Sequence, residues 1–411
     1  KAQLTAGNFL HIGGGWSIRD GYPRGKNPPF LGIDGKQFRD QLCPIASAQP
    51  GFFDATLREA MARMDHFSNN WEAYSSDYKG CFCPQCCTAF AKFTAIPEEE
   101  LKAIWPQEVI RRHHDQWVRF RSLQHAAIIA ALEESISRIG REMGRECHFI
   151  PMLSRSACSE ALTFGQQYSP KDFLKHLKLV NIWGPYTHSA GMRKLYSYLP
   201  GRYLTHYLEV RDVKRFVDKY SEQPIGIIGL PYGCHATNVN PPEAIALETI
   251  DNFLTGYAAS LIYWFNFDYR YYTRMTEANR KIALYEEQVR TWPGDNSVQV
   301  EAAAPVISLE HIRAWLASSK LCPEIESINS TIQLQAYRKD QRLLAAVGNF
   351  WEKSPVFIKL RVPDLSGDYL LLQPHLGQYR RTSGTELAAG IKLYLPALTW
   401  EFFLLEPDQG Q

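Results

Sequence analysis

Short apolar stretches alternate with amphipathic patterns of helical period up to about residue 292. The stretches that predict β-strands lie at 8–14, 66–72, 147–153, 179–186, 224–232 and 260–268. The patterns that predict helices lie between them, at 50–64, 107–144, 171–178, 208–221, 242–258 and 273–291. Such an alternation is typical of parallel strands that are covered by helices and joined by right-handed crossovers.

The predicted helix over 107–144 is the longest, and it has one mainly apolar face that includes a glutamine. The residues of this face are Ile110, Trp117, Phe120, Gln124, Ile128, Leu132, Ile136 and Ile139. A helix of this kind is expected to cover a sheet with its apolar face.

Near-continuous apolar runs such as IGIIGL (225–230) and LIYWF (261–265) indicate strands that are buried on both faces. Aromatic and polar residues collect at the C-terminal ends of the strands, where (β/α)8 barrels place their sites. We therefore predict an α/β fold with a TIM-type barrel. Because the pattern gives six strands and not eight, the chain would lack the first two β/α units of such a barrel, and an open doubly wound sheet is the alternative.

After residue 292 the pattern changes to short strands separated by turn residues, with no long helix after about residue 320. QLQAYR, LLAAVGNF, PVFIKLRV, DYLLLQP, IKLYLPA and TWEFFLLEP predict an antiparallel β-sandwich. The expected domains are a barrel-like domain over 1–292, a connecting segment over 293–320 and an all-β domain over 321–411.

The composition describes a globular protein, with 45% apolar and 21% charged residues in 411 positions. A formal net charge of +2 and the absence of a Lys/Arg run argue against a polyanion-binding surface, so we expect no nucleic-acid partner. Aromatic residues make up 13% of the chain. This excess fits aromatic faces that stack on sugar rings, and it fits a large core equally well.

No apolar run reaches the roughly 20 residues that a membrane span needs, and no signal segment opens the chain, so we expect no membrane partner. The first residue is lysine, which indicates a mature or truncated product. The localisation therefore stays open between cytoplasmic and secreted, and the sequence also leaves homo-oligomerisation open.

Four of the nine cysteines lie within seven residues, which is more typical of a metal site than of a disulfide framework. The C-x-C-x-x-C spacing of Cys81, Cys83 and Cys86 can supply three thiolates to one ion, and tetrahedral zinc needs a fourth. Cys43, in QLCPIAS, is the best candidate, and Cys87 is left over. A disulfide pair or free thiols are the alternatives. Glycines 13–15 do not form a phosphate loop, so we expect no organic cofactor.

Glu72 ends the predicted strand HFSNNWE, beside Asn70 and Trp71. A carboxyl group at the end of a barrel strand is placed to protonate a glycosidic oxygen, and this role needs a raised pKa and an orienting neighbour. The alternative is a salt-bridged glutamate at the entrance of a loop.

Other polar and aromatic residues at strand ends could line a sugar pocket, with His and Asn donating to hydroxyl groups and Trp and Tyr stacking. They are His11, Trp16, Tyr186, His188, Tyr232, His235, Trp264, Asn266 and Asp268. For any one of them, packing at the barrel rim is an equally good explanation.

The stretch from LCP to AFAKF, residues 42–93, resembles glycoside hydrolase family 42, the β-galactosidases. The shared features are a cysteine before a proline, a helix, a strand that ends in Glu, and C-x-C-x-x-C. The resemblance implies a (β/α)8 barrel, a zinc held by Cys43, Cys81, Cys83 and Cys86, and Glu72 as the acid/base. Beyond this stretch the likeness is architectural. GYAASLIYWFNF resembles the last barrel strand of many glycosidases, and the C-terminal strands resemble their small all-β domains.

The sequence departs from this family at two catalytic positions. Trp71 stands where the family has the Asn of its Asn-Glu pair. The family's nucleophile, a Glu at the end of the seventh strand, has no counterpart in IGIIGLPYGCH. A retaining mechanism needs a second carboxylate at about 5 Å. Asp268 is the candidate, ahead of Glu243, which fits a role at the start of a helix.

We therefore predict a glycosidase that cleaves an oligo- or polysaccharide, with Glu72 as general acid/base and Asp268 as the second carboxylate. The alternative is a non-catalytic carbohydrate-binding relative that has lost its nucleophile. A purely structural or protein-binding module would leave the polar and aromatic strand ends without a role.

Overall fold

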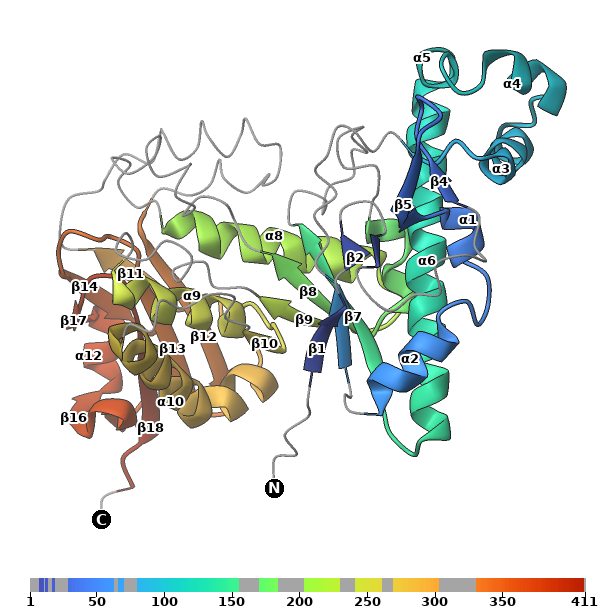
Figure 1. Ribbon diagram of the computed structural model, residues 1–411. Helices are drawn as coiled ribbons and strands as arrows, with labels where there is room; N and C mark the ends of the chain where they lie inside the picture. Colours follow the sequence, from blue (N-terminus) through green and yellow to red (C-terminus); the bar gives the residue numbers. More distant parts are fainter. Residues whose placement is uncertain are drawn as a thin grey trace. The chain divides into compact units, whose positions relative to one another are not determined.

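The computed structural model describes residues 7–10, 12–13, 17–18, 29–62, 66–69, 80–154, 170–183, 203–229, 241–260, 269–302 and 330–409 (Figure 1). The chain divides into two compact units. Unit 1 comprises residues 1–183 and 215–228, and unit 2 comprises residues 184–214 and 229–411.

Unit 1 contains a parallel sheet with the strand order β1-β6-β7-β8-β9. Its strands are β1 (Gly7–Leu10), β6 (His66–Asn69), β7 (His148–Ser154), β8 (Leu179–Trp183) and β9 (Gly226–Gly229). The pairs β1–β6, β6–β7 and β7–β8 are parallel, with His66 opposite both Gly7 and His148. The prediction of parallel strands is confirmed for these pairs, and closure into a barrel stays a prediction.

The N-terminal part of unit 1 also contains a small antiparallel sheet that the sequence pattern did not predict. Its order is β2-β3-β5-β4, with the strands β2 (Ile12–Gly13), β3 (Ser17–Ile18), β4 (Pro29–Leu31) and β5 (Gln37–Leu42). Gly35 forms the turn between β4 and β5 with φ +75°, a conformation that glycine adopts without steric cost. Strand β5 ends at Leu42, and Cys43 is the next residue.

The helices of unit 1 match the predicted positions only in part. They are α1 (Pro44–Ser47), α2 (Asp54–Met61), α3 (Pro84–Thr94), α4 (Glu98–Ile104), α5 (Val109–Arg112) and α6 (His114–Glu142). The predicted helix over 107–144 is divided into α5 and α6 at His113, whose φ of −131° is not helical. The prediction of a helix over 171–178 is wrong. The segment contains two 3-10 turns, Pro170–Asp172 and Leu174–His176, because the φ of Phe173 between them, −131°, is not helical.

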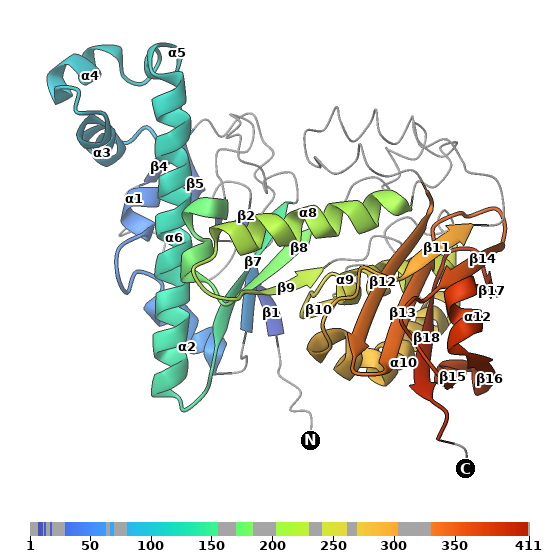
Figure 2. The ribbon, with the colours of Figure 1, turned by 180° about the vertical axis from the view of Figure 1, so that it is seen from behind.

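Helix α6 buries the face that its sequence predicts. Trp117, Ile128, Ile136 and Ile139 are fully buried, and the helix contacts β7 and α2 (Figure 2). Gln124 is also buried, with 4% exposure, so the polar member of this face lies inside the protein as well.

Unit 2 contains two antiparallel sheets that pack face to face. One has the order β12-β13-β18-β15-β16, with β12 (Ile332–Lys339), β13 (Arg342–Asn349), β15 (Asp368–Gln373), β16 (Gln378–Ser383) and β18 (Thr399–Pro407). The other has the order β11-β14-β17, with β11 (Gln299–Ala302), β14 (Val356–Arg361) and β17 (Ile391–Leu395). Leu343 and Phe403 of the first sheet share a buried core with Ile358 and Ile391 of the second, which confirms the predicted β-sandwich.

The opposite face of the five-stranded sheet is covered by helices (Figures 1 and 2). Unit 2 includes β10 (Ala259–Ser260), α9 (Pro242–Leu254), α10 (Tyr269–Thr291), the 3-10 turn η7 (Pro374–Leu376), α12 (Gly384–Ala389) and residues 204–214 of α8 (Leu204–Tyr220). Leu247 of α9 and Tyr285 of α10 pack with Trp400 and Phe402 of β18 in a second core. Strand β18 is therefore buried on both faces, which explains the continuous apolar run TWEFFLL. Of the helices that the structure describes, none has the length and apolarity to span a membrane.

Candidate metal centre

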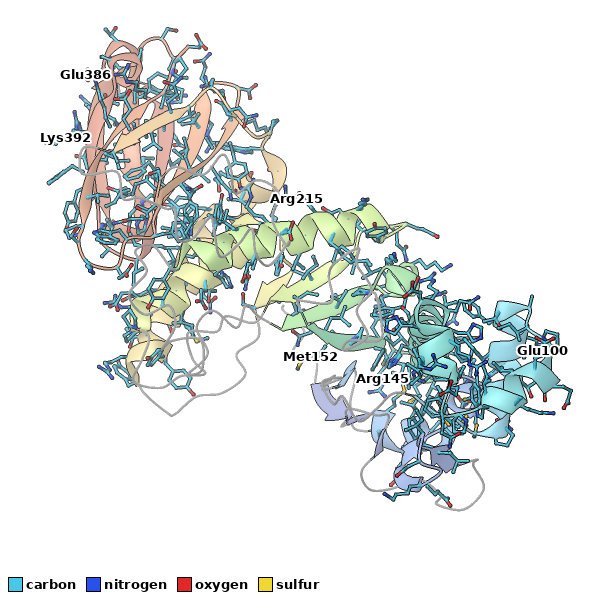
Figure 3. The ribbon with its side chains drawn as sticks, turned by 90° about the horizontal axis from the view of Figure 1, so that it is seen from above. Glu100, Arg145, Met152, Arg215, Glu386 and Lys392 are labelled. Carbon is cyan, nitrogen blue, oxygen red and sulfur yellow. The ribbon has the colours of Figure 1, made fainter. Side chains whose placement is uncertain are left out.

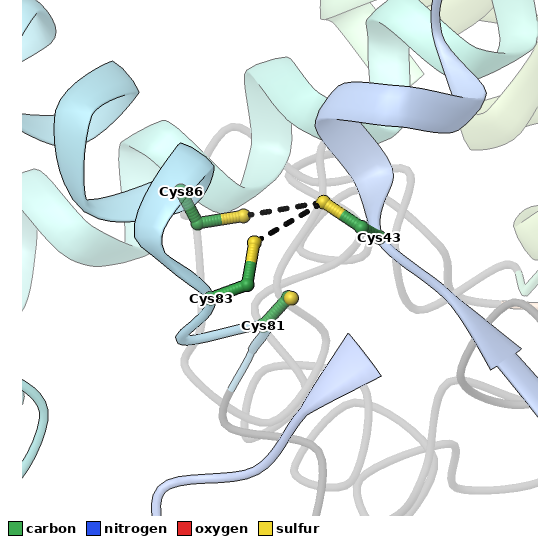
Figure 4. Close-up of side chains that lie close together, drawn as sticks. All are labelled: Cys43, Cys81, Cys83 and Cys86. Atoms are coloured by element: carbon green, nitrogen blue, oxygen red, sulfur yellow. Dashed lines mark hydrogen bonds between the residues drawn. The ribbon is translucent and has the colours of Figure 1, made fainter. Parts of the chain in front are cut away.

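Four cysteines from two separate segments converge in unit 1 (Figure 4). Cys43 lies between β5 and α1, whereas Cys81 and Cys83 lie just before α3 and Cys86 lies in its first turn. The Cys43 Sγ atom is 3.5 Å from that of Cys83 and 3.7 Å from that of Cys86. All four Sγ atoms lie within 4.8 Å of one another, and all four residues are at most 2% exposed. The four predicted ligands are therefore together, in an arrangement compatible with a metal site.

The segment that carries Cys81 and Cys83 is fixed through the residue between them. The Phe82 backbone N–H donates to the Leu31 carbonyl at 2.8 Å, and the Phe82 carbonyl accepts from the Trp105 indole at 2.9 Å. The Phe82 ring stacks on Trp117, with ring centroids 4.9 Å apart. This anchoring directs the two flanking cysteines to the same side, because side chains alternate along an extended segment.

Gly80 allows the segment to approach α6. Its φ is +131°, and a Cβ atom there would lie 2.7 Å from the Trp117 ring and 2.9 Å from the Arg121 side chain. Both the backbone conformation and the space therefore require glycine at this position.

Cys86 and Cys87 occupy different environments although they are adjacent. Cys83 is the N-cap of α3 and Pro84 its first residue, so Cys86 falls in the first turn, facing Cys43. Successive helical residues are rotated by about 100°. Cys87 accordingly points into a cluster that contains Phe90 and Trp117, where it is 4% exposed. The prediction that Cys87 is left over is confirmed.

The sulfur cluster has strongly coupled charges. Hydrogen bonds from the Cys43 and Cys81 thiols lower the pKa of Cys83, whereas the contact with Cys43 raises the pKa of Cys86. Four thiolates at these distances repel one another, so all four can be deprotonated together only next to a cation.

Arg121 and Gln124 of α6 supply the polar contacts next to the sulfurs. The Arg121 guanidinium is 2% exposed and its Nη1 donates to Gln124 Oε1 at 2.5 Å. The Gln124 Nε2 in turn donates to Cys86 Sγ at 3.7 Å. Burial lowers the pKa of Arg121, and the charges of Cys86 and Cys81 oppose this shift. Negative charge on the sulfurs therefore stabilises the buried arginine.

His125 follows on the same helix, with Nε2 at 3.5 Å from Arg121 Nη2. Burial and the neighbouring Arg121 hold the pKa of His125 well below its usual range, so the imidazole is neutral. The sequence pattern alone does not identify Arg121 or His125. The one available signal was Gln124, a polar residue within an otherwise apolar helical face.

The predicted sugar site lies outside the described residues. This holds for both proposed carboxylates, Glu72 and Asp268. It also holds for all the proposed substrate-binding residues, which are His11, Trp16, Asn70, Trp71, Tyr186, His188, Tyr232, His235, Trp264 and Asn266. Glu243 is described. It lies in the first turn of α9, and its Oε1 accepts from Arg274 Nε at 3.1 Å, so it has a structural partner.

No family model matches the chain, and no curated protein matches it. Among solved structures, a catalytic mutant of Gan42B, a GH42 β-galactosidase from G. stearothermophilus, is similar with a TM-score of 0.52 and 11% identity, over 94% of this chain and 87% of that one. An α-amylase from Geobacillus thermoleovorans aligns over 98% of this chain and 99% of its own, with 11% identity and a TM-score of 0.39. An Anoxybacillus α-amylase has 12% identity and a TM-score of 0.37, over 69% of this chain.

The chain spans 64% of the length of this Anoxybacillus enzyme, which is less than two thirds. Of these three structures, the β-galactosidase has a TM-score above 0.5, and at 11% identity its likeness concerns the fold. The protein is therefore similar in fold to this β-galactosidase.

Proposed function

We propose that this protein is a glycosidase that cleaves glycosidic bonds of an oligo- or polysaccharide, with Glu72 as general acid/base. The observation that carries the proposal is the convergence of Cys43, Cys81, Cys83 and Cys86. These cysteines and Glu72 belong to one stretch, 42–93, that resembles family 42. The structure describes the four cysteines but not Glu72, so their convergence supports the resemblance at the cysteine positions. The fold shared with a GH42 β-galactosidase gives further support.

We propose zinc as the ion at the four cysteines. A tetrahedron with Zn–S bonds of about 2.3 Å has sulfurs about 3.8 Å apart, and the contacts of Cys43 are 3.5 and 3.7 Å. Soft thiolate ligands also favour zinc over magnesium or calcium. Four protein ligands leave no open position, so the role is structural. When bound, zinc would link the β5–α1 corner to the segment that follows Glu72.

The second carboxylate is proposed to be Asp268, and the strand-end residues named above are proposed to bind the sugar. The division into 1–292, 293–320 and 321–411 is part of the same proposal. A specific observation favours the alternative, a non-catalytic carbohydrate-binding relative: the segment IGIIGLPYGCH contains no carboxylate where family 42 has its nucleophile.

Hydrolysis of a panel of aryl glycosides tests the enzyme proposal. Glu72→Gln should lower kcat by about a hundredfold or more, since it removes the proton donor. Asp268→Asn should have a comparable effect if this residue is the second carboxylate. Glu100→Gln, on the exposed side of α4, is the matched control and should keep full activity. Retained activity in Glu72→Gln contradicts the assigned role. Sugar binding without cleavage of any substrate favours the alternative.

Metal analysis of the purified protein tests the zinc proposal separately. The expected content is close to one zinc per chain. A clearly substoichiometric content after purification without chelator would contradict it.

A further inference from the structure

The outer face of the three-stranded sheet in unit 2 carries a group of side chains that neither the fold nor the proposed active site uses. Along β14, Val356, Ile358 and Leu360 point into the sandwich core, so the intervening residues point outward. Along β17 the outward positions are Lys392 and Tyr394. We call the set Phe357, Lys359, Arg361, Lys392 and Tyr394 the basic aromatic face.

Two aromatic side chains lie next to each other on this face. Phe357 and Tyr394 are directly opposite in the β14–β17 register, with ring centroids 5.5 Å apart at 62°. They are 48% and 53% exposed. Neither ring belongs to the described core clusters, and together they form a contiguous apolar patch on the sheet surface.

The two lysines of the face lie next to each other. Lys359 is the direct cross-strand partner of Lys392 on one side and of Glu301 of β11 on the other, and like charges in the first position destabilise a sheet. The Lys392 ammonium lies 4.8 Å from the centroid of the Phe357 ring. Figure 3 shows Lys392 at the outer margin of the domain.

Gly390 leaves room for the Lys359 side chain. A Cβ atom there would lie 2.7 Å from the Lys359 side chain, and the φ of Gly390 is +98°. Among the described residues, Glu301 is the carboxylate on this face, and its Oε1 pairs with Arg361 at 3.2 Å. Three cations therefore face one carboxylate.

We propose that the basic aromatic face binds an acidic polysaccharide, that is, a chain of sugar rings that bear carboxylates. The C–H faces of the sugar rings would stack on Tyr394 and Phe357. The carboxylates would accept from Lys359 and Lys392 and relieve the repulsion between them. A neutral glycan would use the rings but leave the excess positive charge of the face unbalanced, because three cations share the one carboxylate of Glu301, so the charge favours an acidic glycan.

The small net charge of the chain argued against a surface for polyanions, and strand pairing explains the difference. Lys359 and Lys392 are far apart in sequence, and only the β14–β17 register brings them together. This binding face goes beyond the proposed hydrolysis and does not depend on it, because it involves neither Glu72 nor the cysteines.

Native affinity electrophoresis of the full chain in gels that contain polygalacturonate tests the proposal, with neutral galactan as the comparison polymer. Polygalacturonate should retard the protein and added salt should weaken the retardation. Tyr394→Ala and the double variant Lys359→Gln/Lys392→Gln should each raise the apparent Kd about tenfold. Glu72→Gln should bind like the wild type, which separates this test from that of hydrolysis.

The matched controls are Tyr379→Ala and Lys339→Gln, because both residues are exposed on the five-stranded sheet and not on this face. Both controls should bind like the wild type, and unchanged circular dichroism should show that all variants are folded. Absence of retardation by polygalacturonate overturns the proposal, as does retardation that the face variants leave unchanged. A wild-type dimer that the face variants convert to a monomer also overturns it, since the face would then be covered by a second copy.

Discussion

Each unit contains a buried cluster of ionisable side chains. The two clusters differ in whether the protein itself supplies enough partners of opposite charge, and a cluster that has them is called completed. In unit 2, Glu401 of β18 accepts from Lys281 Nζ at 2.8 Å and from His375 Nε2 at 2.8 Å. His375 Nδ1 lies 3.0 Å from the Tyr285 hydroxyl, and Lys281 also donates to the Trp400 carbonyl at 2.9 Å. Both oxygens of the carboxylate therefore have partners within the protein.

The pKa of Glu401 reflects the two partners of its carboxylate, His375 and Lys281. Burial alone would raise it, but the hydrogen bond from His375 and the charge of Lys281 outweigh burial and lower the pKa below its usual value. The ionised carboxylate is thus stable without any ligand.

The four-cysteine cluster of unit 1 is not completed in the same way. Among the residues that the structure describes, Arg121 and Gln124 are its side-chain partners of opposite polarity, and the backbone N–H groups of Ala46 and Cys86 add to them. Four thiolates would carry more negative charge than Arg121 offsets. If all four thiols are deprotonated, the cysteine cluster needs a cation, whereas the Glu401 network functions as a structural ion pair without one. This difference distinguishes a ligand site from a structural network.

Removal of a ligand cysteine should have the largest effect on stability. Cys86→Ala should lower the free energy of unfolding by about 4 kcal/mol when free zinc is 1,000-fold above its Kd, because the contribution of zinc binding is lost. Cys87→Ala, one residue later in the aromatic cluster, should cost on the order of 1 kcal/mol through lost packing. Thermal unfolding with and without chelator measures both. Chelator should destabilise the wild type and Cys87→Ala but not Cys86→Ala. Equal losses in the two variants would contradict a metal role for the cysteines.

Removal of the central carboxylate from the completed cluster should have the next largest effect. Glu401→Gln leaves Lys281 without its counter-ion, and the cost should be about 3 kcal/mol, the lower end for a broken buried pair. The reason for the lower end is that Lys281 keeps 15% exposure and its bond to the Trp400 carbonyl. Chemical denaturation measures the loss, and chelator should not change it. Glu406→Gln on the same strand breaks an exposed pair with Arg342 and should cost less than about 1 kcal/mol. A similar cost in both variants would show that the Glu401 network contributes little.

Removal of Arg121, the arginine that lies beside the sulfurs among the described residues, tests how far the protein itself balances the charge of the cysteine cluster. Arg121→Met should lower the zinc affinity about 10- to 100-fold, because it removes the cation and frees the Gln124 carboxamide that donates to Cys86. Competition with a chromophoric chelator measures the affinity. Arg119→Met is the control, since Arg119 lies on the same helix but pairs with Asp172 at 2.5 Å. Its zinc affinity should equal that of the wild type. Equal affinities in both variants would mean that the four sulfurs hold the ion unaided.

The sequence predicted the two clusters unequally, and the reason is how local their determinants are. Three of the four cysteines lie within six residues, so their spacing alone indicates a metal site. The Glu401 network joins α10, η7 and β18, and its members are up to 120 residues apart. No pattern in a single segment identifies such a network. Arg121 was missed for the same reason, because only the packing of α6 against the cysteine segment gives it a role.

The fold shows the same dependence on local signals. The strands of the sandwich with alternating or continuous apolar residues were predicted, since they face the core. Strand β16, with the sequence QYRRTS, was missed because it is an edge strand whose first four residues are all exposed. The 3-10 turns at 170–176 have helical composition but too few residues for a stable helix.

A third cluster, around His148, combines the buried Glu133 with the exposed Glu146. Substitution of His148 should have the smallest effect on stability. His148 Nδ1 lies 3.0 Å from Glu133 and its Nε2 lies 3.0 Å from Glu146. The hydrogen bond to Glu133 raises the pKa of His148 against burial and Lys178, which lower it. Because the folded pKa is raised, the stabilisation is complete below the unfolded value of about 6.5 and is lost as the pH rises through the folded pKa.

The wild type should therefore lose less than about 1 kcal/mol relative to His148→Gln between pH 6 and pH 9, since Glu146 is 76% exposed and its contribution is screened. Urea denaturation at a series of pH values measures this difference. His114→Gln, at an exposed histidine of α6, is the control for the loss of an imidazole. If the stability of His148→Gln relative to the wild type does not change with pH, Glu133 and Glu146 do not hold a charged imidazole. His148 would then be a neutral member of a completed hydrogen-bond network, and under the zinc proposal the cysteine cluster alone among the three would depend on an added ion.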